Sequence, residues 1–457
     1  MGISAMRRRC RGLSLVELMI AMALGVLVSA GIMAVFRSTA DSRQAQEQLA
    51  RLQEEGRFAI TQIKNDLAMA GAQYCMNTGG HAHAGAAGPY LDEWRAPTVY
   101  ASDPAVLLHA LSDVTTPWGG AYPQAPGEPY SLPSFLAMRG YDCMPDSCAP
   151  IDPSDKRSAE GFSIPAMGKA VDSRVIGASV ITVRYLNPAG GWRIAADGGG
   201  GSTLTQHADG SISIALSPSG NEVTLKTLEK GNDPLAMLAD CSSAQIFTVS
   251  GLNNGQATST GSNFAQPRVF QNMVAPRVFS VSRDLRTVTY FLRVVNNGDG
   301  QGHTTGALVR RINGGQGMAS AQDGRTDELV RGVERLDFKY GVQWPDGTVR
   351  YYTAAQVDNS SRADCPAVPL PIRGSNDHGC LWRSVSLIEI DLLMDGQQPL
   401  NALKSGELVY SYAADGIFTP ESPTATGRKV TPLQQGFPPS MLRREFTAVV
   451  AVRNTNP

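Results

Sequence analysis

An apolar run near the N-terminus is the strongest constraint on what this chain can fold into. Residues 13–36 contain one charged side chain, Glu17. A short basic segment precedes the run: Arg7, Arg8, Arg9 and Arg11. As a helix rising ~1.5 Å per residue, the run is about 36 Å long, enough to cross a ~30 Å hydrocarbon core. The sequence therefore predicts a single-pass anchor in the inner membrane, with the basic flank in the cytoplasm and the remainder in the periplasm.

A cleavable secretory signal is the alternative interpretation, because residues 28–30 (Val-Ser-Ala) resemble a small-residue cleavage site. That alternative predicts a mature N-terminus at or after Gly31. Two features favour a retained helix instead. Glu17 costs up to ~3 kcal/mol inside an apolar helix and therefore indicates a function. The apolar run also continues past Ala30 without a break.

The segment that follows, residues 37–70, has the pattern of an amphipathic helix. Apolar and small residues recur at steps of three and four, while charged residues occupy the other faces. The apolar stripe comprises Leu49, Leu52, Gly56, Ala59, Ile60, Ile63, Leu67 and Ala70. We therefore predict one continuous helix over residues 13–70, whose first half spans the membrane.

Proline usage separates this helix from the rest of the chain. None of the 28 prolines precedes Pro89, and a proline inside a helix removes a hydrogen bond and clashes with the preceding turn. The Gly- and Ala-rich stretch 77–88 predicts a flexible loop. Residues 71–457 are rich in Gly and Pro, which suits short strands and long loops. The prediction is an α+β protein, a long helix followed by a large β-rich head that has room for an inserted subdomain.

Several segments of the head alternate between apolar and polar residues, as strands do. They are residues 180–186, 287–294, 334–340, 385–393 and 446–452. Within 334–340, Leu336, Phe338 and Tyr340 face one way, and Arg335, Asp337 and Lys339 face the other, which predicts an antiparallel sheet with one solvent-exposed side. A turn at 344–347 predicts a hairpin with 348–352. Loops are expected at 198–201 and 296–302.

Residues 12–17, Gly-Leu-Ser-Leu-Val-Glu after a basic leader, resemble the type III signal of type IV pilins and type II secretion pseudopilins. The resemblance implies that prepilin peptidase removes a leader of residues 1–12 by cutting between Gly12 and Leu13. It also implies that the new Leu13 amine is N-methylated. Glu17 would then neutralise such an amine between subunits in a low-dielectric bundle. Ala21, Gly25 and Ser29 form a small-residue stripe that allows close helix approach.

Cleavage after Gly12 would also explain the odd cysteine number, because it removes Cys10 and leaves six cysteines in an oxidising compartment. These are Cys75, Cys143, Cys148, Cys241, Cys365 and Cys380. The local disulfide candidates are Cys143 with Cys148 and Cys365 with Cys380, and Cys75 with Cys241 follows by elimination. Since six cysteines allow 15 connectivities, this third pair stays open. Zinc is disfavoured, because the sequence has no CxxC pair.

Two further blocks resemble the PilW family of minor pilins. They are residues 327–342, which contain Gly-Val-Glu-Arg-Leu-Asp-Phe-Lys-Tyr-Gly-Val, and residues 443–454, a terminal strand ending in Arg-Asn. The resemblance implies a protein that assembles with other minor pilins, primes type IV pilus assembly and sits at the pilus tip. It implies the major pilin as a partner and leaves open a large tip adhesin. A J-type pseudopilin of type II secretion is the nearest alternative.

Motifs for catalysis and cofactor binding are missing from the sequence. There is no HExxH, GxSxG, Walker A or dinucleotide fingerprint. Asp299 in a Gly-rich loop is better explained by a tight turn than by calcium, and His81 and His83 by a solvated loop. A net charge of −1 gives no attraction to nucleic acid. We therefore expect no enzyme activity, no catalytic residue, no metal and no cofactor. A secreted enzyme or binding protein with an unusual signal peptide is the remaining alternative.

Overall fold

The computed structural model describes the N-terminal helix and most of the head. The described residues are 14–74, 82–85, 88–91, 97–100, 107, 111, 130–132, 134–154, 164–187, 189–195, 204–209, 211–217, 235–239, 244–253, 255–259, 276–315, 324–344, 346–361, 364, 379–397, 406 and 408–452. The predicted loop at 198–201 lies outside them.

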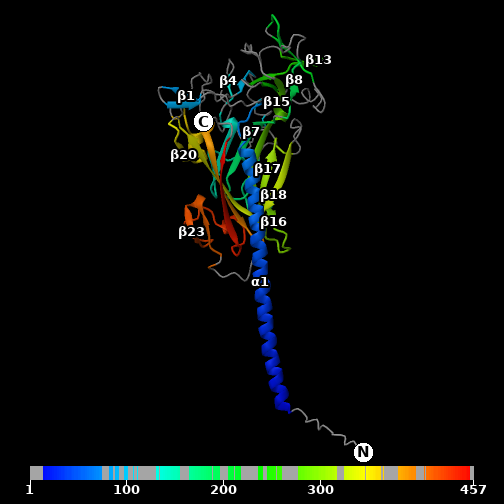
Figure 1. Cartoon of the computed structure of the whole chain (residues 1–457), viewed down its shortest axis with the longest axis vertical. Helices are drawn as coiled ribbons and strands as arrows, with labels where there is room; N and C mark the ends of the chain where they lie inside the picture. The colour runs from blue at the N-terminus through cyan, green and yellow to red at the C-terminus, as the bar shows by residue number, and fades with distance from the viewer. Residues whose placement is uncertain are drawn as a thin grey trace, which may run out of the picture.

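Helix α1 (Leu15–Leu67) is one uninterrupted helix of 53 residues, and it protrudes far from the head (Figure 1). It begins after the N-cap Ser14 and ends at Ala68, beyond which Gly71 has a φ of +72°. The structure thus confirms a single long helix. Of the predicted apolar stripe, Leu52, Gly56, Ala59, Ile63 and Leu67 are buried in the second half of α1, and Ala70 is buried just beyond its end.

A six-stranded sheet forms one wall of the head, in the order β18-β17-β16-β7-β5-β6. Its neighbouring strands are all antiparallel. The strands are β5 (Met138–Cys143), β6 (Cys148–Ala149), β7 (Val180–Leu186), β16 (Leu285–Asn296), β17 (Thr304–Ile312) and β18 (Arg325–Arg331). β7 matches the predicted strand 180–186, and the loop expected at 296–302 connects β16 to β17.

A four-stranded antiparallel sheet forms the second wall, in the order β20-β19-β21-β24. Its strands are β19 (Val333–Gln343), β20 (Val349–Tyr352), β21 (Val385–Asp395) and β24 (Arg443–Ala451). The predicted hairpin is confirmed, since Trp344 N–H donates to Thr348 O at 2.9 Å between β19 and β20. One hydrophobic core joins both sheets to the second half of α1. Three short helices border it: α3 (Ser134–Ala137), α6 (Ala354–Asp358) and η2 (Cys380–Ser384).

A second core lies at the end of the head farthest from the start of α1, where Figure 1 labels β8, β13 and β15. Two further sheets carry it, ordered β4-β3-β12-β11-β15-β8 and β13-β14-β10-β9. Their strands are β3 (Thr98–Val99), β4 (Tyr130–Ser131), β8 (Trp192–Arg193), β9 (Leu204–Gln206), β10 (Ile212–Ala215), β11 (Leu235–Ala239), β12 (Ala244–Thr248), β13 (Gly251–Asn253), β14 (Gln256–Ser259) and β15 (Arg277–Ser280). We call this part the distal module.

Most of the distal module interrupts a single hairpin of the first wall. Leu186 at the end of β7 pairs with Leu285 at the start of β16, so the chain leaves the wall and returns to the same place. The short helix α5 (Val281–Asp284) leads back into β16. Because β7 and β16 pair at the place where the chain leaves and returns, the first wall is continuous there. Most of the distal module is therefore an insertion between these two strands.

Two small hairpins complete the described fold. β1 (Ala82–Gly85) and β2 (Gly88–Leu91) pair antiparallel, with His83 opposite Tyr90. This corrects the predicted loop at 77–88, because a Gly/Ala-rich stretch can still pair when its backbone groups find a partner strand. His81 lies outside the described residues. β22 (Tyr410–Tyr412) and β23 (Ile417–Glu421) form the second hairpin, with η4 (Ala413–Asp415) between them and α7 (Pro432–Gln435) following.

Candidate assembly site

The first half of α1 makes no packing contact with the head. Its large apolar side chains are exposed along the whole segment that begins at Leu15 and ends at Phe36; Leu15 is 74 % exposed and Phe36 is 78 % exposed. The first buried position along the helix is Gln48. The helix is long and apolar enough to cross a membrane, and none of its most apolar stretch is buried. This arrangement fits a membrane anchor, because an apolar surface of this size needs lipid or another protein to cover it.

Glu17 closes a capping box at the start of α1. Its Oε2 accepts the Ser14 N–H at 3.0 Å, and Ser14 Oγ accepts the Val16 N–H at 3.2 Å. The Ser-x-x-Glu spacing of residues 14–17 is the sequence signal for this motif. In the single chain, the carboxylate thus stabilises the positive end of its own helix. Gly12 and Leu13 lie outside the described residues, so cleavage and methylation there stay predictions.

The small-residue stripe of Ala21, Gly25 and Ser29 is exposed on this half of α1. A Cβ added to Gly25 would have no heavy atom within 4 Å. No described residue of the head therefore occupies this stripe. Its use in a subunit contact stays a prediction.

Asp66 attaches the second half of α1 to the six-stranded sheet. Its carboxylate oxygens accept hydrogen bonds from Arg310 at 2.6 and 2.9 Å. They also accept the hydroxyls of Tyr185 at 2.7 Å and Tyr290 at 2.6 Å. Burial, followed by the charge of Asp66, raises the pKa of Tyr185 to about 12 and raises that of Tyr290 further. Burial alone would lower the pKa of Arg310. The hydrogen bond and the charge of Asp66 outweigh burial, so the pKa of Arg310 is raised.

Asp66 was not predicted as an important residue. It lies on the amphipathic helix between apolar positions, and charged residues on such a helix are usually solvated. The sequence holds one usable signal: Asp66 immediately precedes the buried Leu67, so it lies at the border of the apolar stripe. Its three partners come from β7, β16 and β17, which only the fold brings together.

Gly56 provides a close contact between α1 and the four-stranded sheet. A Cβ at this position would lie 2.5 Å from the Phe446 ring of β24. At the preceding residue, Glu55 Oε2 accepts a hydrogen bond from Gln397 Nε2 at 2.8 Å. Gly396 packs equally closely against Gln48, because a Cβ added to Gly396 would lie 2.5 Å from the Gln48 amide oxygen. The helix is therefore held by apolar, polar and close backbone contacts along one face.

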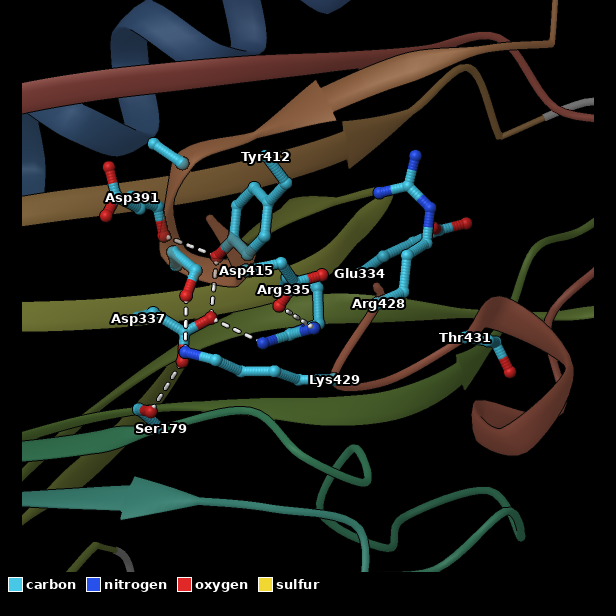
Figure 2. A network of polar contacts seen from close by, with 12 residues as sticks. Ser179, Glu334, Arg335, Asp337, Asp391, Tyr412, Asp415, Arg428, Lys429 and Thr431 are labelled. Atoms are coloured by element: carbon cyan, nitrogen blue, oxygen red, sulfur yellow. Dashed lines mark hydrogen bonds and ion pairs between the residues drawn. The ribbon is translucent and has the colours of Figure 1, made fainter. Parts of the chain in front are cut away.

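The charged face of β19 is covered at Arg335 and Asp337, although Lys339 stays 41 % exposed, which corrects the prediction of a one-sided sheet. The side-chain alternation of 334–340 is confirmed, but Arg335 is only 3 % exposed. The β22–β23 hairpin lies over this face and supplies Tyr412 and Asp415 (Figure 2). The reason is that ion pairing can offset the cost of burying charge, so a polar face does not have to meet water.

Asp337 is the centre of this buried network in Figure 2. It accepts hydrogen bonds from Arg335 at 2.9 Å, from Tyr412 at 2.7 Å and from Ser179 at 2.9 Å. Arg335 also donates to Asp415 at 3.2 Å. Burial raises the pKa of Asp415 and raises that of Tyr412 well above its ordinary value. The network therefore connects the hairpin, β19 and the first wall, and its groups are occupied with one another.

The cysteines are disulfide-bonded where the structure describes them. Cys143 and Cys148 form a disulfide between β5 and β6, as predicted. Cys380 is disulfide-bonded as well. Three cysteines, Cys75, Cys241 and Cys365, lie outside the described residues. The pairing of Cys365 with Cys380 and that of Cys75 with Cys241 therefore stay predictions.

Metal binding finds no support in the described part of the chain, where no group of three or more His, Cys, Asp or Glu side chains could hold an ion. Asp299 accepts hydrogen bonds from Gln301 N at 2.8 Å, from Asn297 Nδ2 at 3.2 Å and from His303. Both of its oxygens are thus used within the loop, in agreement with the tight turn favoured above.

Comparison with known families agrees with this organisation. The family model described as Type IV Pilus-assembly protein W (PilW) matches residues 289–454. The C-terminal part of the chain is thus similar to the PilW family. A second model, described as the prokaryotic N-terminal methylation motif, matches residues 7–33. Searches of curated proteins and of solved structures give no match.

The PilW region, residues 289–454, contains most of the surface that receives α1. Arg310, Gln397 and Phe446 all belong to it, and so does the network around Asp337 apart from Ser179. The two matches together identify a type IV pilus-related, pilin-like protein. They indicate a structural subunit that is processed by prepilin peptidase and assembles with other pilins. The distal module lies outside both matches.

Proposed function

We propose that this protein is a minor pilin that joins other minor pilins to prime type IV pilus assembly and then occupies the pilus tip. The observation that carries the proposal is the division of α1, in which a PilW head holds one half and leaves the apolar half uncovered. Lipid would cover that half before assembly, with the head in the periplasm. Neighbouring pilin helices would cover it afterwards, since close packing replaces lipid contacts.

Processing at Gly12 and Leu13 would prepare the helix for this exchange. The methylated Leu13 amine would be a cation at the edge of an apolar bundle, and an uncompensated buried charge costs several kcal/mol. Glu17 of a neighbouring subunit is the counter-charge that we propose. Its capping contact with Ser14 N–H uses one carboxylate oxygen, which leaves the other oxygen available to the amine.

The position of the distal module supports a place at the tip. It lies at the end of the head opposite the exposed half of α1 (Figure 1). In a filament, the next head along the axis packs above each subunit, so a bulky distal insertion suits the terminal position best. A large adhesin is the additional partner that such a position would permit, next to the major pilin and the other minor pilins.

The test replaces Glu17 by Leu in cells that lack the native copy. Insertion and leader cleavage should survive, because the change removes a desolvation cost of up to ~3 kcal/mol from the apolar helix. The number of surface pili should fall sharply. Glu47→Leu is the matched control, since Glu47 is an exposed carboxylate on the same helix outside the apolar run, and it should leave pilus number unchanged.

Three measurements decide the outcome: membrane level, the N-terminal peptide mass and pilus counts. Normal piliation by Glu17→Leu would contradict the pairing mechanism, and an N-terminus at Gly31 would contradict processing as a prepilin. Immunogold labelling of an epitope in the head should mark pilus ends, and labelling along the shaft would contradict the tip position. Loss of type II secretion with normal piliation would favour the pseudopilin alternative.

A further inference from the structure

A buried guanidinium lies directly against the disulfide of the β5–β6 hairpin. The Arg174 side chain is fully buried, and its Nη1 lies 3.1 Å from Cys143 Sγ and 3.4 Å from Cys148 Sγ. Nη2 pairs with Asp152 Oδ1 at 2.8 Å, and Nε donates to Pro165 O at 3.2 Å. The cation is therefore fixed from three directions, and one of its nitrogens points at the two sulfur atoms.

The two cysteines of this disulfide differ in their access to solvent. Cys143 is 3 % exposed, whereas Cys148 is half-buried at the tip of the hairpin, near the exposed Met144. A thiolate that approaches from solution therefore reaches Cys148 first. The hairpin is also held by backbone contacts, among them Met144 N–H to Ser147 O at 2.8 Å. Its shape therefore does not rest on the disulfide alone.

We propose that Cys143–Cys148 is a thiol–disulfide exchange site, in which an exposed cysteine thiolate of another protein attacks Cys148 and Arg174 stabilises the departing Cys143 thiolate. The incoming sulfur forms a bond to Cys148 Sγ, and the bond between Cys148 and Cys143 breaks. The electron pair of that bond stays on Cys143 Sγ. The product is a mixed disulfide at Cys148 and a thiolate at Cys143, so atoms and charge balance without a further reactant.

The positive charge of Arg174 beside Cys143 is the physical reason why Cys143 is the leaving sulfur and Cys148 is the sulfur attacked. A neighbouring cation lowers the pKa of a thiol, and a thiolate of lower pKa leaves faster. Burial lowers the pKa of Arg174 to about 10, with Asp152 acting in the opposite sense, so the guanidinium remains charged at neutral pH. Asp152 is 39 % exposed and offsets part of that charge. Removing the aspartate should therefore strengthen the effect of Arg174 on Cys143.

The experiment uses the full chain in detergent micelles at neutral pH, with reduced glutathione as the thiol probe. Samples are quenched in acid, alkylated with N-ethylmaleimide and mapped by mass spectrometry. We expect glutathione on Cys148 and N-ethylmaleimide on Cys143, while Cys380, which is buried and disulfide-bonded, stays unmodified over the same time. Arg174→Gln should slow the reaction roughly tenfold, because it removes the cation next to the leaving sulfur. Arg174→Lys should keep part of the rate.

A purely structural role for Arg174 predicts the opposite result. Loss of the guanidinium would then loosen the hairpin, so that Arg174→Gln would react faster and both sulfurs would be attacked. Asp152→Asn keeps the proposal testable if the arginine variants do not fold. It should react several-fold faster than the wild type at an unchanged unfolding temperature. Faster reaction of Arg174→Gln, glutathione on Cys143, or no acceleration in Asp152→Asn would each overturn the proposal.

Discussion

The two halves of α1 form one unbroken helix but have opposite surroundings. Side chains of residues 14–44 are exposed wherever the structure describes them, whereas buried positions recur at steps of three and four from Gln48 onward. The more apolar half is thus the more exposed one. Hydrophobicity alone therefore does not decide which half packs on the head. The second half has a matching surface in its own chain, and the first half needs lipid or other subunits.

The largest effect is expected from breaking the polar attachment of the second half. Asp66→Ala removes the carboxylate that accepts from Arg310, Tyr185 and Tyr290. Among the described residues, Tyr290 keeps Gln62 O at 3.1 Å, and Arg310 keeps only Asp327 at 3.9 Å. We expect the free energy of unfolding of the head to fall by about 3 kcal/mol or more, because an uncompensated buried charge is costly. Urea unfolding of the full chain in detergent, followed by tryptophan fluorescence, measures it. Glu54→Ala, an exposed carboxylate on the same helix, should change it by less than about 0.5 kcal/mol.

Gly56→Ala tests the close approach of helix and sheet. The added methyl group meets the Phe446 ring at 2.5 Å, and overpacking of this kind costs about 1–3 kcal/mol. The better helix propensity of Ala returns up to ~1 kcal/mol, so the head should be destabilised overall. Gly25→Ala is the matched change in the exposed half and should leave head unfolding unaltered. Phe446→Leu should rescue Gly56→Ala, and equal effects at both glycines would contradict the comparison.

Asp395 makes the stability of the head depend on pH near its contact with the second half of α1. It lies in the turn that receives Gln48 and Glu55, and burial together with the charge of Glu334 raises its pKa from 3.8 to about 7. The folded state therefore binds this proton more tightly than the unfolded chain, and the resulting stability is lost as the pH rises through about 7.

Asp395→Asn should remove that contribution, because the amide stays neutral at every pH. We expect the stability of the variant relative to wild type to increase from pH 5 to pH 8, because only the wild-type protein loses stability over this range. The measurement is the free energy of unfolding of each protein at pH 5 and at pH 8, compared as the difference between variant and wild type at each pH. A difference that is the same at both pH values would show that Asp395 does not titrate on folding.

The smallest effect is expected at the exposed ion pair of Arg51 and Glu55, which are 2.8 Å apart on one face of α1. The Arg51 side chain is 60 % exposed, and such pairs contribute less than about 0.5 kcal/mol. Arg51→Ala should therefore leave the urea midpoint almost unchanged. A larger loss would mean that Arg51 orients Glu55 toward Gln397, and Glu55→Gln would then show the same loss.

Local patterns in the sequence were sufficient for the elements whose determinants lie close together along the chain. The apolar run, the three- and four-residue periodicity and the absence of proline predict α1 to within a few residues of its ends. Alternation predicts β7 and β19, and the turn at Trp344 predicts the β19–β20 hairpin. The five-residue separation of Cys143 and Cys148 predicts their disulfide.

Only the tertiary structure decided the contacts between residues that lie far apart in the sequence. Asp66 meets Arg310, and Arg335 meets Asp415 beneath a hairpin that covers the charged face of β19. Arg174 lies against a disulfide that precedes it by some 30 residues. Periodicity records how polar a face is, but not whether another part of the chain carries the complementary charge. That complement, rather than polarity itself, determines whether a charged face meets water or is buried.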